Sequence, residues 1–448
     1  MREMLPNILI TMSDDQRATA LSCDGSLTAD AAQTPHLDAL SRRGVRFLNA
    51  YHAGSASPAV CSPSRAMLHT GRGPFDVPAD MVDDSMAPGY RGSSNAPTLG
   101  QLLTASGYAT HFVGKWHNGK NSFQRGFASG EALFFGGMDH HTNLPLEDFD
   151  GESYEPRFAH GVHSTDQLAA SATSFLKRYA SGACGDQPFC LTVAFTAPHD
   201  PRQTHTQWHD RYPADAIDLP ENFTPEHPID YGCDGLRDEL LTPQPRDPGQ
   251  TRHEIADYYA MVEHLDHAIG RIHGTLESLG LNDNTLVIHT SDHGLAVGQH
   301  GLMGKQNLYE HSIGVPLVLA GPNVPAGTQR GHLVYQHDLF PTLLESAGAG
   351  VPADCGFESL WPIIADGGRA GRAGIGCFYR DRVRAFRSGD QKVILYKLGS
   401  GETVCQQFDL AKDPWEQNHE LLPLAEVDGG LRESLRAWQH RVGDPEVD

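Results

Sequence analysis

Short apolar runs alternate with amphipathic segments along the chain up to about residue 348. Residues 6–12, 189–195 and 285–291 are strand-length segments with apolar centres, which is typical of buried strands covered on both faces. Residues 253–279 repeat apolar side chains with the helical period, which predicts a long helix packed on the sheet. The pattern therefore predicts an α/β fold in which a large mixed, mostly parallel sheet is sandwiched by helices.

The pattern changes beyond this point. Three short segments between residues 384 and 410 favour antiparallel strands joined by glycine turns, and residues 431–442 favour a closing helix. We therefore predict a core domain over residues 1–348 and a smaller C-terminal α+β subdomain, an antiparallel sheet with a terminal helix, over residues 349–448.

Two stretches favour long loops. Residues 118–155 are rich in Gly, Phe, His and Asp, and residues 201–249 are rich in Pro and Asp. Long loops on a rigid scaffold often carry specificity, so we expect these two insertions to shape a binding site.

Composition narrows the class of protein. The 448 residues are 39% hydrophobic and 20% charged, which suits a globular chain with a sizeable core, and the formal net charge is -22. This charge argues against a protein held on nucleic acid or on an anionic membrane by its overall field. The eight cysteines are scattered without a C-x-x-C pair, so we interpret them mostly as reduced thiols. Nothing in the sequence indicates the oligomeric state.

The first residues run directly into a predicted strand, with no basic segment followed by an apolar one. We therefore expect a cytoplasmic protein as the sequence is written, or a periplasmic or secreted one if a signal peptide has been removed. No apolar span is long enough to cross a membrane.

Acidic residues and a histidine follow two of the predicted strands. Asp14 and Asp15 come after the first strand, and Asp292 and His293 come after the strand at residues 285–291. In open α/β sheets ligands gather at the carboxyl ends of strands, so these side chains form a candidate cation site. Three carboxylates and an imidazole favour Ca²⁺, Mg²⁺ or Mn²⁺ over a thiolate-type zinc site. The alternative is a solvated carboxylate pair that caps the next helix.

Basic side chains also follow predicted strands. Lys115 and His117 end one strand and would share a face if the chain stayed extended there, and His199 follows another. Lys305 closes a glycine-rich turn. A cation and an imidazole side by side suit an anionic substrate, although each alone is an ordinary surface residue.

The segment from Cys61 to Gly71 predicts a helix. Ser62 suits the N-cap, Pro63 suits the first helical position, and Gly71 suits a left-handed end. Cys61 should then lie just before a helix whose first N–H groups are unpaired, a favourable place for negative charge. The alternative is a capped helix beside an ordinary buried cysteine.

Taken together, these blocks resemble the type I formylglycine-dependent sulfatases of the alkaline-phosphatase-like superfamily. Cys61-Ser62-Pro63-Ser64-Arg65 followed by Thr70-Gly71 is similar to the family's C-x-P-S-R maturation signature with T-G at the same spacing. The resemblance runs from about residue 6 to residue 421. Further similar blocks are Asp14-Asp15, Gly114 to His117, Pro198-His199, Ser291 to Gly294, His300 to Lys305 and Phe408 to Pro414.

The resemblance implies a modified residue and a metal. Cys61 would be oxidised to formylglycine by a maturation enzyme, and its hydrated aldehyde would be the nucleophile. One divalent cation, Ca²⁺ first and Mg²⁺ or Mn²⁺ as alternatives, would be held by Asp14, Asp15, Asp292, His293 and the residue-61 side chain.

The resemblance also implies roles for the basic residues. Arg65 and Lys115 would steady the formylglycine and the charge around it. His117 would take the proton that lets sulfate leave. His199 and Lys305 would hold sulfate oxygens and protonate the leaving group.

The implied function is a sulfuric ester hydrolase that acts on a small sulfated substrate, most simply a sulfated carbohydrate. Many family members carry Asn where this chain has His293, and His there also occurs in relatives that cleave phosphonate monoesters and phosphodiesters. A phosphonate monoester or phosphodiester hydrolase is therefore one alternative, and a choline sulfatase is another. A non-catalytic binding module is a third, although every catalytic position is filled.

Overall fold

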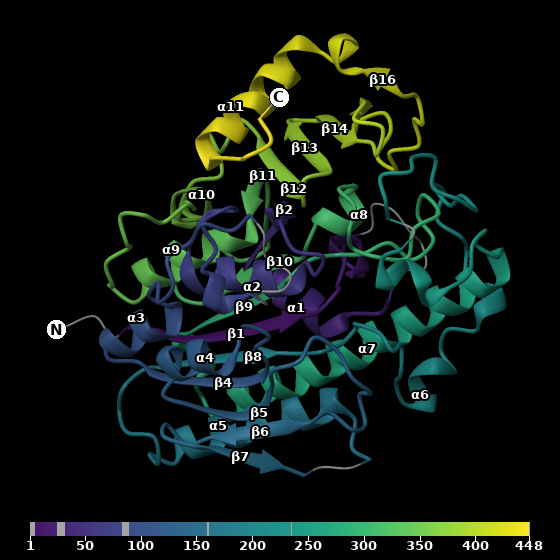
Figure 1. Ribbon diagram of the computed structural model, residues 1–448. Helices are drawn as coiled ribbons and strands as arrows, with labels where there is room; N and C mark the ends of the chain where they lie inside the picture. The colour runs from purple at the N-terminus through teal and green to yellow at the C-terminus, as the bar shows by residue number, and fades with distance from the viewer. Residues whose placement is uncertain (1–4, 25–31, 83–88, 159–160, 234, 448) are drawn as a thin grey trace.

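The computed structural model describes residues 5–24, 32–82, 89–158, 161–233 and 235–447. Its largest element is a ten-stranded sheet in the order β11-β2-β10-β9-β1-β8-β4-β5-β6-β7 (Figure 1). The strands are β1 (Asn7–Ser13), β2 (Val45–Tyr51), β4 (Ala109–Lys115), β5 (Ser129–Phe134), β6 (Leu146–Phe149), β7 (Tyr154–Arg157), β8 (Phe189–Ala194), β9 (Thr285–Ser291), β10 (Leu317–Ala320) and β11 (Thr328–Tyr335).

The centre of this sheet is parallel. β1 runs parallel to β8 and β9, and β4 runs parallel to β8 and β5. β10 is antiparallel to both of its neighbours, and β6 and β7 form an antiparallel edge. The predicted large mixed, mostly parallel sheet is therefore confirmed.

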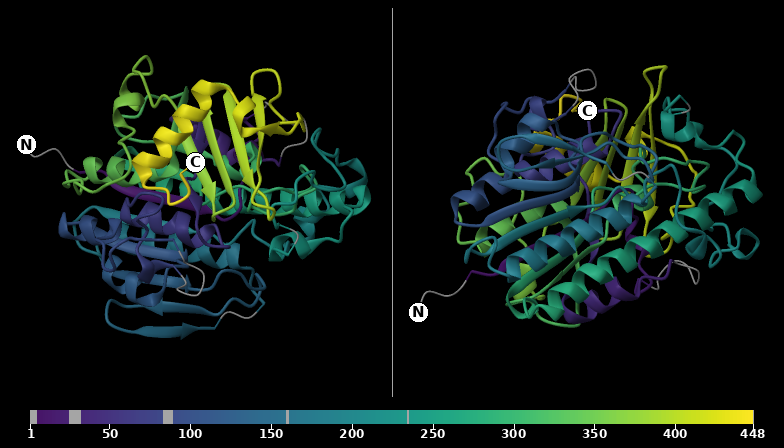
Figure 2. Two further views of the ribbon diagram at one scale, coloured as in Figure 1. Left: turned by 45° about the horizontal axis from the view of Figure 1, so that its top comes forward. Right: turned by 90° about the horizontal axis from the view of Figure 1, so that it is seen from below.

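Helices cover both faces of the sheet. α1 (Pro35–Arg43), α5 (Ser164–Ala180) and α7 (Pro248–Ser278) lie side by side on one face (Figure 2). The other face carries α2 (Cys61–Thr70), α3 (Leu99–Ala105), α4 (Lys120–Gly126) and α9 (Leu339–Ser346). In β1, Leu9 packs on the first layer, whereas Ile8 and Ile10 pack on the second. Apolar residues on both faces explain why the strand is a continuous apolar run.

A smaller six-stranded sheet has the order β16-β15-β14-β13-β12-β3, and α11 (Gly429–Val442) packs across it (Figure 2). Four antiparallel strands form most of it, and three of them are the strands predicted between residues 384 and 410. Its remaining edge strand, β3 (Gly54–Ser55), comes from the first part of the chain and runs parallel to β12. The other strands are β12 (Ile375–Tyr379), β13 (Val383–Ser388), β14 (Gln391–Lys397), β15 (Thr403–Asp409) and β16 (Leu422–Pro423).

Some sequence-based expectations were wrong. Residues 118–155 are not mainly loop, because they contain α4 and the strands β5, β6 and β7. The strands β3, β11, β12 and β16 were not predicted either. The expectation for residues 201–249 is confirmed, because the described part of this insertion is irregular apart from short turns, α6 (Thr206–His209) and the start of α7. The two remaining short helices are α8 (Glu310–Ile313) and α10 (Trp361–Ala365). Among the described helices, none combines the length and apolarity of a membrane span.

Asp266 of α7 holds the start of α1. The Thr34 side chain makes no capping bond, and the backbone N–H groups of His36 and Leu37 donate instead to the Asp266 carboxylate at 3.0 and 2.8 Å. Burial raises the pKa of Asp266 to about 7, although these two N–H groups act in the opposite direction. Between its ordinary pKa of 3.8 and about 7, the folded state therefore binds a proton that the unfolded state has lost.

The contribution of the Asp266 carboxyl to the free energy of unfolding is fully present below pH 3.8 and is lost as the pH rises through about 7. We predict that Asp266→Asn is less stable than the wild type, because one amide oxygen replaces two acceptors, and that the difference shrinks as the pH rises. This difference in the free energy of unfolding should change by at most about 1.4 kcal/mol per pH unit. Urea unfolding from pH 4.5 to 7.5 measures it, with the exposed Glu277→Gln on the same helix as control. A difference that stays constant or widens would contradict the assignment.

Candidate active site

The candidate site lies at the carboxyl ends of the central parallel strands. Asp14 and Asp15 follow β1, Asp292 and His293 follow β9, and Lys115 is the last residue of β4. Because β1 lies between β8 and β9 in parallel register, these strand ends meet at one edge. The topology therefore brings together residues that are up to 279 positions apart in the sequence.

Cys61 stands at the start of α2. The structure corrects the predicted start of this helix: α2 begins at Cys61, with Val60 as N-cap and no capping side chain, so Ser62 is not the cap. Cys61 is buried with 3% of its surface exposed. Gly71 ends the helix with a left-handed φ of 65°, as expected.

Hydrogen bonds fix α2 to the strand ends. Asn118 donates to the Ser62 carbonyl at 2.7 Å, and the hydroxyl of Ser64 donates to the Asp292 carbonyl at 2.6 Å. The side-chain amide of Gln336 donates to both Ser64 and the Asp292 carbonyl, at 2.7 and 2.8 Å. The position of residue 61 relative to Asp292 is thus set by buried polar contacts.

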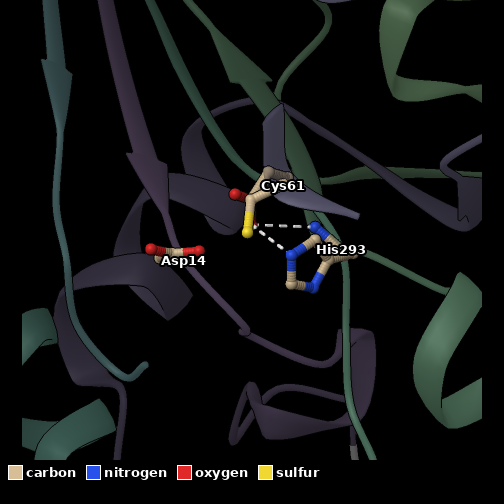
Figure 3. Close-up of side chains that lie close together, drawn as sticks. Asp14, Cys61 and His293 are labelled. Carbon is tan, nitrogen blue, oxygen red and sulfur yellow. Dashed lines mark hydrogen bonds and ion pairs between the residues drawn. The ribbon is translucent and has the colours of Figure 1, made fainter. Parts of the chain in front are cut away.

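Four potential ligand atoms meet beside Cys61. Asp14, Cys61, Asp292 and His293 are all buried, and one ligand atom from each lies within 4.8 Å of the others. Figure 3 shows the Cys61 sulfur directed toward the His293 imidazole, with the Asp14 carboxylate close by. Asp15 belongs to an overlapping group with Asp14 and His199.

The residues present fit a bound cation. Oδ1 of Asp14 and Nε2 of His293 are buried without a hydrogen-bond partner among the described residues, which is costly unless another group satisfies them. Burial lowers the pKa of His293, but the carboxylates of Asp292 and Asp15 raise it to about 9, so a positive charge is favoured there. Carboxylate oxygens are the preferred ligands of hard cations.

Three cationic side chains balance the carboxylates. Nε of Arg65 lies 2.9 Å from Asp292, and Nζ of Lys305 lies 3.0 Å from Asp15. Lys115 forms an ion pair with Asp14. The side chains of all six residues are at most 4% exposed. Such buried charges are tolerated only when they are paired and hydrogen-bonded.

The environment of residue 61 favours negative charge. Burial raises the pKa of the Cys61 thiol, but the ammonium groups of Lys115 and Lys305 outweigh it and hold the pKa well below its ordinary value. Hydrogen bonds from His117 and His199 act in the same direction. An anionic group at this position is therefore stabilised from several sides.

His117 and His199 reach residue 61 from different elements. The chain is not extended at His117, whose φ is 61°, so Lys115 and His117 do not share a strand face as the sequence pattern had suggested. Nδ1 of His199 donates to the Asp200 carbonyl at 2.8 Å, and Nζ of Lys305 lies at the same distance from its Nε2.

The sequence-based prediction missed a group of supporting residues. The Arg237 guanidinium forms two hydrogen bonds with the carboxylate of Asp200, beside His199. Asp238 lies 3.8 Å from Nζ of Lys305. His141 donates to the His199 carbonyl at 3.0 Å. The adjacent histidines at 140–141 and the acid after His199 were the only signals that pointed to them.

Glu239 holds the turn that carries Lys305. Its carboxylate accepts from the backbone N–H groups of Met303 and Gly304, both at 3.0 Å, and from the Arg246 guanidinium at 2.5 Å. Glu239 and Arg246 are 3% and 1% exposed. The arrangement as a whole can bind an anionic group, activate a hydroxyl at residue 61 and supply protons from two histidines and a lysine.

Comparisons with known proteins agree with this geometry. The family model described as Sulfatase matches residues 6–349, and a model described as N-sulphoglucosamine sulphohydrolase, C-terminal, matches residues 298–436.

Individual relatives extend over most of the chain. The chain is 27% identical to an N-acetylglucosamine-6-O-sulfatase of Bacteroides thetaiotaomicron over 92% of its own length and 82% of the relative's. It is 29% identical to a choline-sulfatase of Rhizobium meliloti over 92% of the chain and 81% of that protein. A solved structure of a protein in complex with its substrate D-glucosamine-2-N,6-O-disulfate has the same fold, with a TM-score of 0.79, 24% identity and 99% of both chains covered.

We predict that Glu239→Ala lowers the free energy of unfolding by about 3–5 kcal/mol, because it removes the carboxylate that pairs with the buried Arg246 and leaves Nη2 of Arg246 and two buried N–H donors without an acceptor. Glu239→Gln should cost less, since one amide oxygen remains. Denaturant unfolding measures both, with the exposed Glu226→Ala as control. An effect of Glu239→Ala no larger than that of the control would mean that this carboxylate does not hold the turn.

Proposed function

The chain belongs to the sulfatase family, and from this premise we propose that it hydrolyses the sulfate ester of a carbohydrate with residue 61 as the nucleophile. The observation that carries the proposal is the position of Cys61. It lies buried at the start of α2, among paired carboxylates and cations and within reach of two histidines.

Sulfatases in general use formylglycine, which a maturation enzyme makes from cysteine. We infer that Cys61 is modified in this way. Its hydrated aldehyde would present two hydroxyl groups, one to attack sulfur and one whose deprotonation releases sulfate and restores the aldehyde. The ammonium groups of Lys115 and Lys305 favour negative charge on this residue, as the depressed pKa of its thiol indicates.

We assign the cation to Asp14, Asp15, Asp292, His293 and the residue-61 side chain, with Ca²⁺ as the first candidate and Mg²⁺ or Mn²⁺ as alternatives. When bound, a divalent ion supplies Lewis acidity that lowers the pKa of a nearby hydroxyl. The carboxylates orient that hydroxyl, and Arg65 keeps Asp292 in place through its 2.9 Å contact.

Three basic residues would handle protons and sulfate oxygens. His199 and Lys305 lie 2.8 Å apart, so one can hold a sulfate oxygen while the other donates a proton to the departing alcohol. His117 hydrogen-bonds residue 61 from another side and would take the proton that lets sulfate leave. Lys115, paired with Asp14, neutralises charge beside the nucleophile.

The carbohydrate part of the proposal is supported by the N-acetylglucosamine-6-O-sulfatase relative and by the C-terminal model of an N-sulphoglucosamine sulphohydrolase. We therefore place a sulfated amino sugar first among the substrates to test. Choline sulfate is the second candidate, because the choline-sulfatase relative is similar over the same share of the chain. Because His also occurs at the position of His293 in relatives that cleave phosphonate monoesters, a phosphonate monoester is the substrate to compare with the sulfate esters.

We predict that protein produced with a maturation enzyme releases sulfate from N-acetylglucosamine 6-sulfate or a related sulfated saccharide faster than it cleaves choline sulfate or a phenyl phosphonate monoester. Cys61→Ala should lower kcat/KM by on the order of 10³-fold or more, because the nucleophile is lost. Mass spectrometry of the peptide that contains residue 61 should show oxygen in place of sulfur. Cys355→Ala, a cysteine outside the site, is the matched control.

Phosphonate cleavage far above sulfate release would overturn the reaction class. Faster turnover of choline sulfate would agree with a sulfatase but would contradict a carbohydrate as the preferred substrate. An unmodified thiol together with full activity would rule out formylglycine.

We predict that chelation abolishes sulfate release and that Ca²⁺ restores it better than Mg²⁺ or Mn²⁺. Asp292→Asn should lower the bound metal, measured by elemental analysis of dialysed protein, because it removes one negative ligand from the group. The exposed Asp283→Asn should keep the wild-type content. Full activity after complete metal removal would refute the cation site, and better restoration by Mn²⁺ would reassign the ion.

A further inference from the structure

A second group of potential metal ligands lies outside the candidate active site. Asp166 of α5, His205 at the N-cap of α6 and His264 of α7 offer one ligand atom each, all within 4.8 Å of one another. Nε2 of His205 lies 2.8 Å from Oδ2 of Asp166, and Nε2 of His264 lies 3.3 Å from the same oxygen. We propose that these three side chains bind a zinc-class divalent cation.

The separations suit such an ion. Zinc binds imidazole nitrogen and carboxylate oxygen at about 2.0–2.2 Å, so tetrahedral ligands lie roughly 3–4 Å apart. Two imidazoles and a carboxylate form a three-ligand set with room for water, and they favour a borderline metal over a hard one. The His205 and Asp166 side chains are 45% and 29% exposed, so an ion can enter from solvent.

Neighbouring groups hold the ligands in place. Nδ1 of His264 lies 2.8 Å from Oγ1 of Thr204, a hydroxyl that can accept the ring proton when Nε2 binds metal. Nη1 of Arg271 donates a hydrogen bond to Oδ1 of Asp166 at 2.7 Å. The other carboxylate oxygen, Oδ2, faces the imidazoles of His205 and His264. The Trp208 ring is stacked with the His264 ring, at 5.7 Å between centroids and 17° between planes.

Another group of His and Glu side chains fits an ion less well. Ligand atoms of His300, His311 and Glu416 also lie within 4.8 Å of one another. Oε1 of Glu416 is 2.7 Å from Nζ of Lys392, and Oε2 accepts from the backbone N–H of Glu310. Both oxygens are thus occupied, one by a buried cation, whereas Oδ2 of Asp166 faces two imidazoles.

An ion at the proposed site would join three segments. Thr204 and His205 follow His199 on one loop, while Asp166 and His264 belong to the packed helices α5 and α7. Binding would cross-link this loop to the helices, and it would stabilise the folded protein because the unfolded chain lacks the site.

Zinc titration of the full-length protein tests the proposal. Wild type should bind one more equivalent of Zn²⁺ than His205→Ala, a partly exposed position where substitution is compatible with folding. Zn²⁺ should also raise the Tm of the wild type more than that of the variant. Thr204→Val should weaken binding at this site about tenfold. His209→Ala is the matched control, because His209 pairs with Asp257 at 3.1 Å on α6 and α7 without belonging to a three-ligand group of described residues.

Any Zn²⁺ that binds at the candidate active site binds equally to the wild type and the variants, so it does not affect the difference in stoichiometry between them. Equal Zn²⁺ stoichiometry in wild type and His205→Ala would overturn the proposal and leave a hydrogen-bonded trio without an ion. Loss of one equivalent in His209→Ala as well would also overturn it, because the ligands would then be wrongly assigned.

Discussion

The burial of paired charges at one edge of the sheet is the constraint on which the site depends. Asp14, Asp15 and Asp292 are each within contact of Lys115, Lys305 or Arg65, and none of these side chains is more than 4% exposed. Removing so many charges from water costs several kcal/mol per ion, and only close pairing offsets it. The core around this edge therefore has to place each partner accurately.

Parallel strands and the start of α2 provide that accuracy. The carboxyl ends of β1 and β9 lie in register, so Asp14-Asp15 and Asp292-His293 meet without long connections. Arg65 belongs to the same helix as Cys61 and bonds both Asp292 and the Lys115 carbonyl, at 2.9 and 2.6 Å. One guanidinium thus fixes the helix, β9 and β4 relative to one another, and residue 61 is placed as a consequence.

Much of this could be predicted from the sequence, because long apolar runs and the polar pairs that end them are local signals. The predicted active-site residues do lie together. The strands β5, β6 and β7 could not be predicted, because β5 and β7 contain Gly130 and Pro156, and because β6 and β7 are only four residues long and are stabilised by pairing at the sheet edge. Arg237 and Glu239 were also missed, since their partners Asp200 and Met303 lie 37 and 64 residues away and no motif joins them.

Two residues of the site adopt a backbone conformation that suits glycine better than themselves. Asp15 has a φ of 70° and His117 a φ of 61°, at a typical cost of about 1–3 kcal/mol each. The fold retains them because each side chain makes a contact that glycine cannot make. The Asp15 carboxylate lies 3.0 Å from Lys305, and His117 hydrogen-bonds Cys61. The Asp15 backbone is held in turn by the Tyr258 hydroxyl at 3.0 Å and by the Asp292 carboxylate at 3.3 Å. The strain is thus located where charge pairing and access to residue 61 require a side chain.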